Sequence, residues 1–216
     1  MTGIPEIVAT SDGSQTLRHH ITGETYHSVN GAVGESMHVF IRNGFEAHPA
    51  RHVRILEAGF GSGLNALLTL HAAENTGRSV DYTAIELYPL GPEIVREMDY
   101  ASDPLFVKIH DTPWNGKYDI TEWFSLTKID GDLADMQFTT IFDIVYYDAF
   151  APDSQPELWT EEIFRRIYDA LAPEGILVTY SAKGDVKRAL RSAGFTVSRL
   201  EGAPGKRHML RAVKTK

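Results

Sequence analysis

The sequence contains no cysteine among its 216 residues. This excludes disulfides, cysteine metal clusters and a cysteine nucleophile. No apolar run approaches the roughly 18 residues that a membrane-spanning helix needs. The N-terminus lacks both the basic region and the apolar core of a signal peptide, so we expect a cytoplasmic protein. The nine histidines include no pair with ligand spacing on one helix face, so no metal site is expected.

Length and composition indicate one globular domain, with 43% hydrophobic and 23% charged residues. The net charge of −8 hides a gradient along the chain. Residues 183–216 hold ten Lys and Arg against two acids, a charge of +8, so residues 1–182 carry −16. Such asymmetry indicates a polyanion-binding face. A solvated amphipathic helix followed by a basic terminus is the alternative.

Residues 53–65 read as a buried strand, a glycine turn and the start of a helix. A dinucleotide fingerprint would place its third glycine at position 64, which is Leu64. The pattern instead is Glu-x-Gly-x-Gly-x-Gly, and it resembles the motif of class I methyltransferases that bind S-adenosylmethionine (SAM). An acid near the turn suits SAM, which has an amino-acid ammonium and no pyrophosphate. A plain glycine turn remains the alternative. The cofactor-binding candidates from this stretch are Glu57, Gly59, Phe60, Gly61, Gly63 and Asn65.

Two further acids fit the same cofactor. Glu86 ends the second predicted strand, about 20 residues past the glycines, where it can accept hydrogen bonds from both ribose hydroxyls. A solvated acid at a strand end is the alternative. Asp132 lies in a loop over residues 129–133, where methyltransferases hold the adenine amino group with a carboxylate.

The predicted fold class is α/β: a doubly wound, seven-stranded, Rossmann-like SAM-dependent methyltransferase with a reversed last strand. Residues 1–50 form an N-terminal extension, a hairpin plus a helix covering the cofactor, and residues 51–216 form the methyltransferase domain. Residues 113–128 form a small, partly helical insertion. Further strands are predicted over residues 105–110, 140–147, 176–180, 195–200 and 208–213. Further helices are predicted over residues 89–100, 159–171 and 183–193.

The segment Asp148-Ala149-Phe150-Ala151-Pro152 makes the resemblance more specific. With the glycine loop, Tyr26-x-Ser28, residues 34–36 and residues 205–210, it resembles the methyltransferase domain of the MnmC family of tRNA 5-methylaminomethyl-2-thiouridine biosynthesis. The resemblance covers nearly the whole chain and implies a standalone form without the FAD-dependent oxidase domain. It implies N-methylation of a 5-aminomethyl group on a wobble uridine, in the anticodon region of tRNA. His208 departs from this family, which often carries an acid at that position.

This substrate agrees with the missing cysteine, because methyl transfer to a pyrimidine carbon commonly uses a cysteine adduct, whereas an amine is already nucleophilic. Asp148, at the end of the central strand, is the catalytic candidate that accepts the proton or orients the nitrogen. A helix cap or turn acid is the alternative. Phe150 stacks on the base or belongs to the core.

Other candidates have weaker support. Tyr26, Ser28 and Glu35 are candidates for the methionine end of SAM, although a loop hydroxyl and a capping acid explain them equally well. Basic candidates for tRNA phosphates are Lys183, Lys187, Arg188, Lys206 and Arg207. Two other functions stay open: a SAM-dependent enzyme acting on a small amine or acid, such as an aminopropyltransferase, and a non-catalytic SAM-binding module associated with RNA. The sequence leaves the oligomeric state undetermined.

Overall fold

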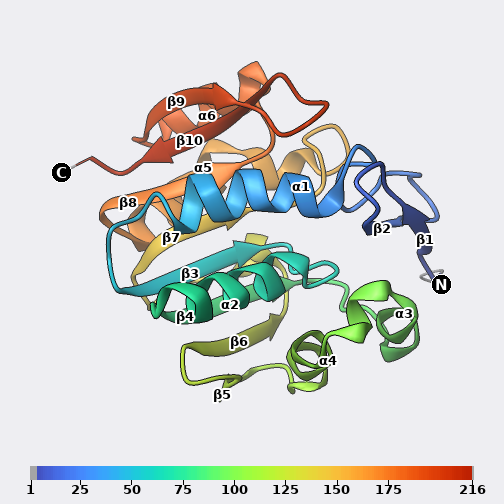
Figure 1. The fold of residues 1–216 in the computed structure, drawn as a ribbon. Coiled ribbons are helices and arrows are strands. Elements are labelled where there is room, and N and C mark those ends of the chain that lie inside the picture. The colour runs from blue at the N-terminus through green and yellow to red at the C-terminus, as the bar shows by residue number, and fades with distance from the viewer. Residues whose placement is uncertain (1–3, 216) are drawn as a thin grey trace.

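The computed structural model describes residues 4–215. Residues 1–3 of the predicted N-terminal extension and Lys216 of the basic segment lie outside this range. The chain forms a central sheet between two helical layers, with a small separate hairpin near the N-terminus (Figure 1). The hairpin, β1 (Glu6–Ala9) and β2 (Gln15–Arg18), has the antiparallel pairing predicted for this region.

The sheet has eight strands in the described part of the chain, in the order β5-β6-β4-β3-β7-β8-β10-β9. β3, β4, β6, β7 and β8 run parallel, whereas β10 is antiparallel to both of its neighbours, as predicted for the last strand. The eighth strand, β5, pairs antiparallel with β6 at the edge. The strand bounds are β3 (His52–Ala58), β4 (Ser79–Glu86), β5 (Gly116–Asp119), β6 (Phe124–Asp130), β7 (Phe142–Tyr147), β8 (Leu171–Thr179), β9 (Thr196–Glu201) and β10 (His208–Val213).

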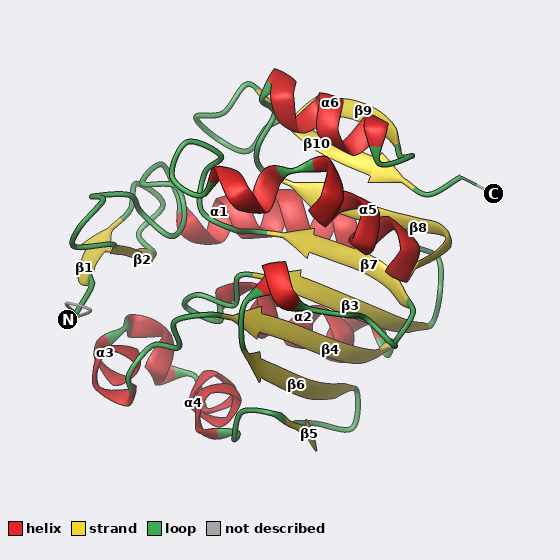
Figure 2. Ribbon diagram, turned by 180° about the vertical axis from the view of Figure 1, so that it is seen from behind, coloured by secondary structure: helices red, strands yellow, loops and turns green. Residues whose placement is uncertain are grey.

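The helices cover both faces of the sheet, each over its own apolar core. One face carries α1 (Ala32–Ser36), its π-helical continuation η1 (Met37–Phe45) and α2 (Leu64–Thr76), and the other carries α5 (Glu161–Ala170) and α6 (Gly184–Ser192) (Figure 2). Every residue of β7 is buried, as a central strand covered on both faces requires. The remaining helices are α3 (Pro92–Glu97), α4 (Pro104–Asp111) and the short 3₁₀ turns η2 (Asp99–Ser102), η3 (Leu133–Asp135) and η4 (Pro156–Trp159).

The predicted strand over residues 105–110 is wrong, because this segment is helix α4. Asp103 caps the helix by accepting from the backbone N–H of Leu105 at 2.8 Å, and Pro104 occupies its first turn. Phe106 and Ile109, three residues apart, face the core.

The partly helical insertion predicted over residues 113–128 is also wrong, since it contains β5 and most of β6. β6 supplies the third parallel strand and extends to Asp130, into the predicted loop over residues 129–133. The buried Lys128 places a charged residue within β6, so the sequence did not read as a buried strand. The Lys128 ammonium donates to the carbonyl of His110 at 2.8 Å and lies 4.8 Å from the centre of the Trp114 ring.

Candidate functional site

A cavity of about 380 Å³ opens at the carboxyl ends of the parallel strands, where ligands bind in open α/β sheets. The N-terminal segment over residues 24–29 and the turn between β9 and β10 complete its wall. Ten of the predicted site residues line it: Tyr26, Ser28, Glu35, Gly59, Gly61, Glu86, Asp132, Asp148, Phe150 and Lys206.

The glycine loop forms one wall because two of its positions leave no room for a side chain. A Cβ on Gly59, whose φ is +89°, would lie 2.7 Å from the carbonyl oxygen of Asp148. A Cβ on Gly61, whose φ is +51°, would lie 3.0 Å from the ring of Tyr26. Bare backbone therefore faces the cavity, as close approach of a ligand requires.

Four members of the predicted motif do not line the cavity. Gly63 precedes α2, and the Phe60 side chain is buried on the other side of the loop against His110 and Trp114. Glu57 and Asn65 are buried and do not line the cavity. Asn65 reaches it indirectly, through its hydrogen bond to Asp148.

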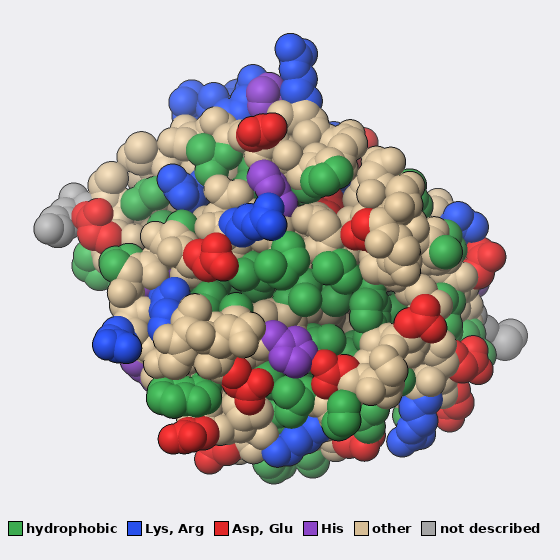
Figure 3. Space-filling model, in the orientation of Figure 1, with side chains coloured by type: hydrophobic (Ala, Val, Ile, Leu, Met, Phe, Trp, Pro, Cys, Tyr) green, Lys and Arg blue, Asp and Glu red, His purple; other side chains and the backbone are tan. Residues whose placement is uncertain are grey.

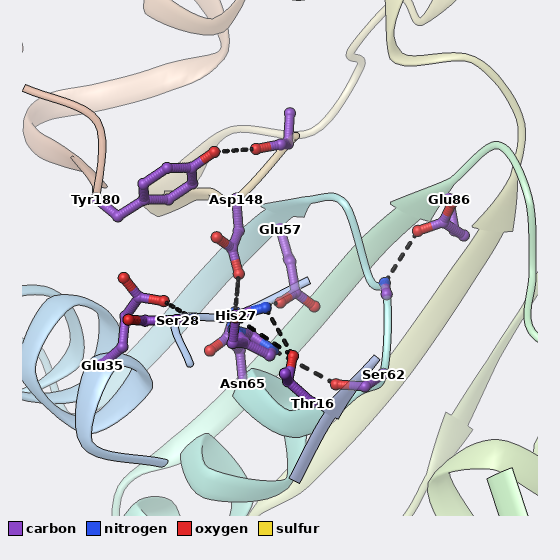
Figure 4. A network of polar contacts seen from close by, with 12 residues as sticks. Thr16, His27, Ser28, Glu35, Glu57, Ser62, Asn65, Glu86, Asp148 and Tyr180 are labelled. Atoms are coloured by element: carbon purple, nitrogen blue, oxygen red, sulfur yellow. Dashed lines mark hydrogen bonds and ion pairs between the residues drawn. The ribbon is translucent and has the colours of Figure 1, made fainter. Parts of the chain in front are cut away.

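Asn65 forms hydrogen bonds to two carboxyl groups, that of the buried Glu57 and that of Asp148, which lines the cavity. Its side-chain nitrogen donates to Glu57 Oε1 at 2.9 Å and to Asp148 Oδ2 at 2.8 Å (Figure 4). Burial raises the pKa of Glu57 to about 8, against the opposing hydrogen bond from Asn65. Burial, followed by the negative charges of Glu35 and Glu57, raises the pKa of Asp148 well above its ordinary value. Asp148 is therefore suited to hold or accept a proton near neutral pH.

Glu86 and Asp132 shape the opposite part of the cavity. Glu86 Oε2 accepts from the backbone N–H of Gly61 at 2.9 Å, and its Oε1 accepts from that of Tyr88 at 3.0 Å. Asp132 accepts from the backbone N–H of Ala134 at 2.8 Å and caps η3. Both carboxylates are held by backbone groups while lining the cavity.

Glu35 and Lys206 meet across the cavity from opposite ends of the chain. Glu35 Oε2 accepts from the backbone N–H of Ser28 at 2.8 Å, and its Oε1 lies 2.5 Å from Lys206 Nζ. The ammonium also lies 4.2 Å from the centre of the Tyr180 ring. Lys206 therefore faces the cavity instead of presenting its charge outward.

The lining residues that the sequence analysis did not single out include His27 and Tyr180. Burial lowers the pKa of His27 to about 4, so its ring is neutral at pH 7 and its 3.8 Å contact with Asp148 is not an ion pair. The Tyr180 hydroxyl donates to the carbonyl of Ala149 at 2.8 Å. Tyr180 directly follows a parallel strand, and this position was the signal available in the sequence.

The remaining candidates lie at or beyond the mouth. The half-buried Phe150 ring stands edge-on to Tyr26, with centroids 5.0 Å apart. Tyr88, which also lines the cavity, is 63% exposed. Lys183 pairs with Asp153, and Arg207 is exposed outside the cavity. Lys and Arg side chains gather along the edge formed by α6, β9 and β10 (Figure 3).

The cavity fits SAM by its chemistry. It offers a glycine cradle, acids at two strand ends and buried side-chain atoms that, among the described residues, lack a hydrogen-bond partner, including Glu24 Oε2 and His27 Nδ1. Residues 4–215 contain no cluster of three metal-ligating side chains. None of the helices described there has the length and apolarity to cross a membrane.

Comparisons with known proteins identify the class. A family of S-adenosyl-L-methionine-dependent methyltransferases matches residues 119–215. The fold also resembles spermidine synthase from Thermotoga maritima, with a TM-score of 0.57 and 17% identity over 99% of this chain and 71% of that one. Fold, cavity and family match together define a SAM-dependent methyltransferase with SAM as its cofactor.

A closer likeness is to the crystal structure of MnmC2 from Aquifex aeolicus, with a TM-score of 0.80 and 31% identity over 99% of this chain and 71% of that one. The chain belongs to the MnmC2 family. The bifunctional protein MnmC of Burkholderia thailandensis, named for tRNA 5-methylaminomethyl-2-thiouridine biosynthesis, is 31% identical over 94% of this chain. The chain spans about a third of the length of the curated relatives it matches, 34% in this case.

Proposed function

We propose that this protein transfers a methyl group from SAM to the 5-aminomethyl nitrogen of a wobble uridine in tRNA, producing 5-methylaminomethyluridine or its 2-thio form. The names of the relatives supply the substrate class, and the observation that carries the proposal is Asp148 in the cavity. Bound SAM supplies an electrophilic methyl group. A tRNA substrate also accords with the cytoplasmic location predicted from the sequence.

The protonation of Asp148 suits an amine substrate. An alkyl amine is largely protonated at pH 7, and only its free form accepts a methyl group. Proton transfer is more efficient when donor and acceptor have similar pKa values, and burial brings the pKa of Asp148 toward that of an amine. Asn65 fixes the orientation of the carboxyl group by donating to Oδ2. Asp148 then takes the amine proton and holds the nitrogen in position.

The residues around Asp148 divide into a cofactor side and a substrate side in this proposal. Glu86 holds the ribose, Asp132 the adenine amino group, and Gly59 and Gly61 admit the cofactor to the backbone. Tyr26, Ser28 and Glu35 enclose the methionine end, so residues 1–50 act as an extension that covers the cofactor over the domain of residues 51–216. Phe150 and the exposed Tyr88 present aromatic surface at the mouth on which a uracil ring stacks.

The basic edge supplies the tRNA contacts. Lys183, Lys187, Arg188 and Arg207 belong to the segment of charge +8. These side chains, of which Lys187 is half-buried and the others are exposed, can neutralise phosphates on either side of the anticodon, while the acidic remainder keeps binding local and oriented. The anticodon region is proposed because a wobble uridine lies there.

The test uses tRNA from a strain that lacks wobble-uridine methylation. Incubation with the protein and SAM, followed by nucleoside analysis, is expected to convert 5-aminomethyluridine into its methylamino form. Asp148→Asn should abolish most of the conversion. Unchanged nucleosides, together with methylation of a small free amine, would replace this proposal with a small-molecule methyltransferase.

A further inference from the structure

Lys206 occupies the turn between β9 and β10 and reaches into the cavity across the chain. Its side chain is only 33% exposed, and its ammonium lies 2.5 Å from Glu35 Oε1, a side chain that is 5% exposed. The face of the Tyr180 ring holds the same ammonium at 4.2 Å from its centre. Lys206 is thus fixed in position before any ligand binds.

The charges around the cavity are strongly unequal. Its acidic lining residues are Glu24, Glu35, Glu86, Asp132 and Asp148. Among the lining residues that the structure describes, Lys206 is the one Lys or Arg. His27 adds no charge at pH 7, because burial holds its pKa near 4. The Lys206 ammonium is therefore the one positively charged side chain that a ligand carboxylate can meet among the lining residues that the structure describes.

The methionine end of SAM carries both an ammonium and a carboxylate. The ammonium finds several possible partners among the acids, whereas the carboxylate has one charged partner. An ammonium side chain has three donors, so Lys206 can hold Glu35 and a second carboxylate at once. We infer that Lys206 binds the carboxylate of SAM, and that this contact makes the protein select SAM over decarboxylated SAM.

This assignment gives Lys206 a different role from the tRNA phosphate contact predicted from sequence. It also separates the protein chemically from aminopropyl transfer, which uses decarboxylated SAM. Removing the carboxylate raises the ligand's positive charge, and an acidic cavity without Lys206 would favour that form. Lys206 therefore determines which of the two ligands, SAM or decarboxylated SAM, binds more tightly, as well as how large the difference in affinity is. This inference rests on SAM as the cofactor and is independent of the proposed tRNA substrate.

The experiment measures binding of SAM and decarboxylated SAM by calorimetry, without RNA and without turnover. The wild-type protein is expected to bind SAM at least about tenfold more tightly than decarboxylated SAM. Lys206→Met should weaken SAM by about 10- to 100-fold, the range expected for hydrogen bonds to charged groups. Decarboxylated SAM should bind that variant at least as tightly as it binds wild type, which inverts the preference.

Two further variants make the result specific. Lys206→Arg keeps the charge and should keep the preference for SAM. Arg199→Met removes an exposed cation of β9 that does not line the cavity, and both affinities should stay at their wild-type values. Equal binding of the two ligands by the wild-type protein would overturn the inference, even if Lys206→Met failed to fold. An equal loss of both ligands in a folded Lys206→Met variant would also overturn it.

Discussion

Asn65 Nδ2 lies 2.8 Å from Asp148 Oδ2, so the helix that follows the glycine loop holds the acid of the central strand in place. The same nitrogen donates to Glu57, which connects the cavity to a carboxyl group buried beneath it. The segment around the glycine motif therefore does more than admit a cofactor, because Asn65, two residues after the last glycine, orients the group assigned to the amine.

The first prediction concerns Asp148. Asp148→Asn keeps the shape of the side chain and removes its capacity to accept a proton, so single-turnover methylation should fall by about 10²–10⁴. SAM affinity should change much less. Asp169→Asn, on an exposed position of α5, is the matched control and should retain the wild-type rate. A near-wild-type rate in Asp148→Asn would remove Asp148 from the mechanism.

The second prediction concerns Asn65 as a positioning residue. Its hydrogen bond lowers the pKa of Asp148 against the effect of burial, so Asn65→Leu should raise that pKa further. The rate of methylation rises with pH as Asp148 loses its proton, and in the variant this rise should occur at higher pH. Part of the lost rate should therefore return as the pH is raised. A uniform loss at all pH values, with the rise at the same pH as in the wild-type protein, would indicate a purely structural role.

The third prediction concerns stability without ligand. The pKa of Glu57 is about 8 in the folded protein because of burial, against an ordinary value of 4.5. Between these values the folded state binds more protons than the unfolded state, so this residue makes the free energy of unfolding decrease as pH rises from 4.5 to 8. Glu57→Gln should remove this contribution in urea denaturation across that range. Parallel curves for the two proteins would contradict the assignment.

The fourth prediction concerns the ribose contact. Glu86→Ala should weaken SAM by about 1.5–3 kcal/mol, the range for hydrogen bonds to a charged group. The carboxylate also holds the N–H of Gly61, so Glu86→Gln, which keeps acceptor and shape, should lose less. Calorimetry that finds wild-type affinity in Glu86→Ala would exclude the contact.

The fifth prediction concerns tRNA. Arg207→Ala should weaken tRNA binding and reduce the slope of log K against log salt by about 0.7–0.9, the value for one lost phosphate contact. SAM affinity should not change, because Arg207 lies outside the cavity. Arg51→Ala, an exposed cation before β3, should keep the wild-type slope. An unaltered slope in Arg207→Ala would show that Arg207 contacts no tRNA phosphate and is only a solvated surface residue.

The sequence predicted the fold where apolar patterns and turn residues coincide. The strand before the glycine loop, the buried β7 and the reversed last strand all carry such signals. Prediction failed at α4 and β6. The apolar run of α4 outweighed its Asp103-Pro104 start, and Lys128 made the largely buried strand β6 look polar.

The candidate site was predictable at the carboxyl ends of strands, where Glu86 is the last residue of β4 and Asp148 directly follows β7. The direction of Lys206 was not, because its partner Glu35 comes from the other end of the sequence and no local pattern couples the two. His27 was hidden for a similar reason. Its neutrality follows from burial by segments that lie far apart in the sequence.

The pairing of Glu35 with Lys206 has a consequence for biosynthesis. The first part of the cavity wall leaves the ribosome early, but the turn carrying Lys206 emerges only with the last strand of the sheet. A nascent chain therefore lacks a complete cofactor site until the turn before β10 has been translated. Because SAM then binds the finished fold and not the unfolded chain, cellular SAM at 100 times its Kd would stabilise the protein by about 2.7 kcal/mol.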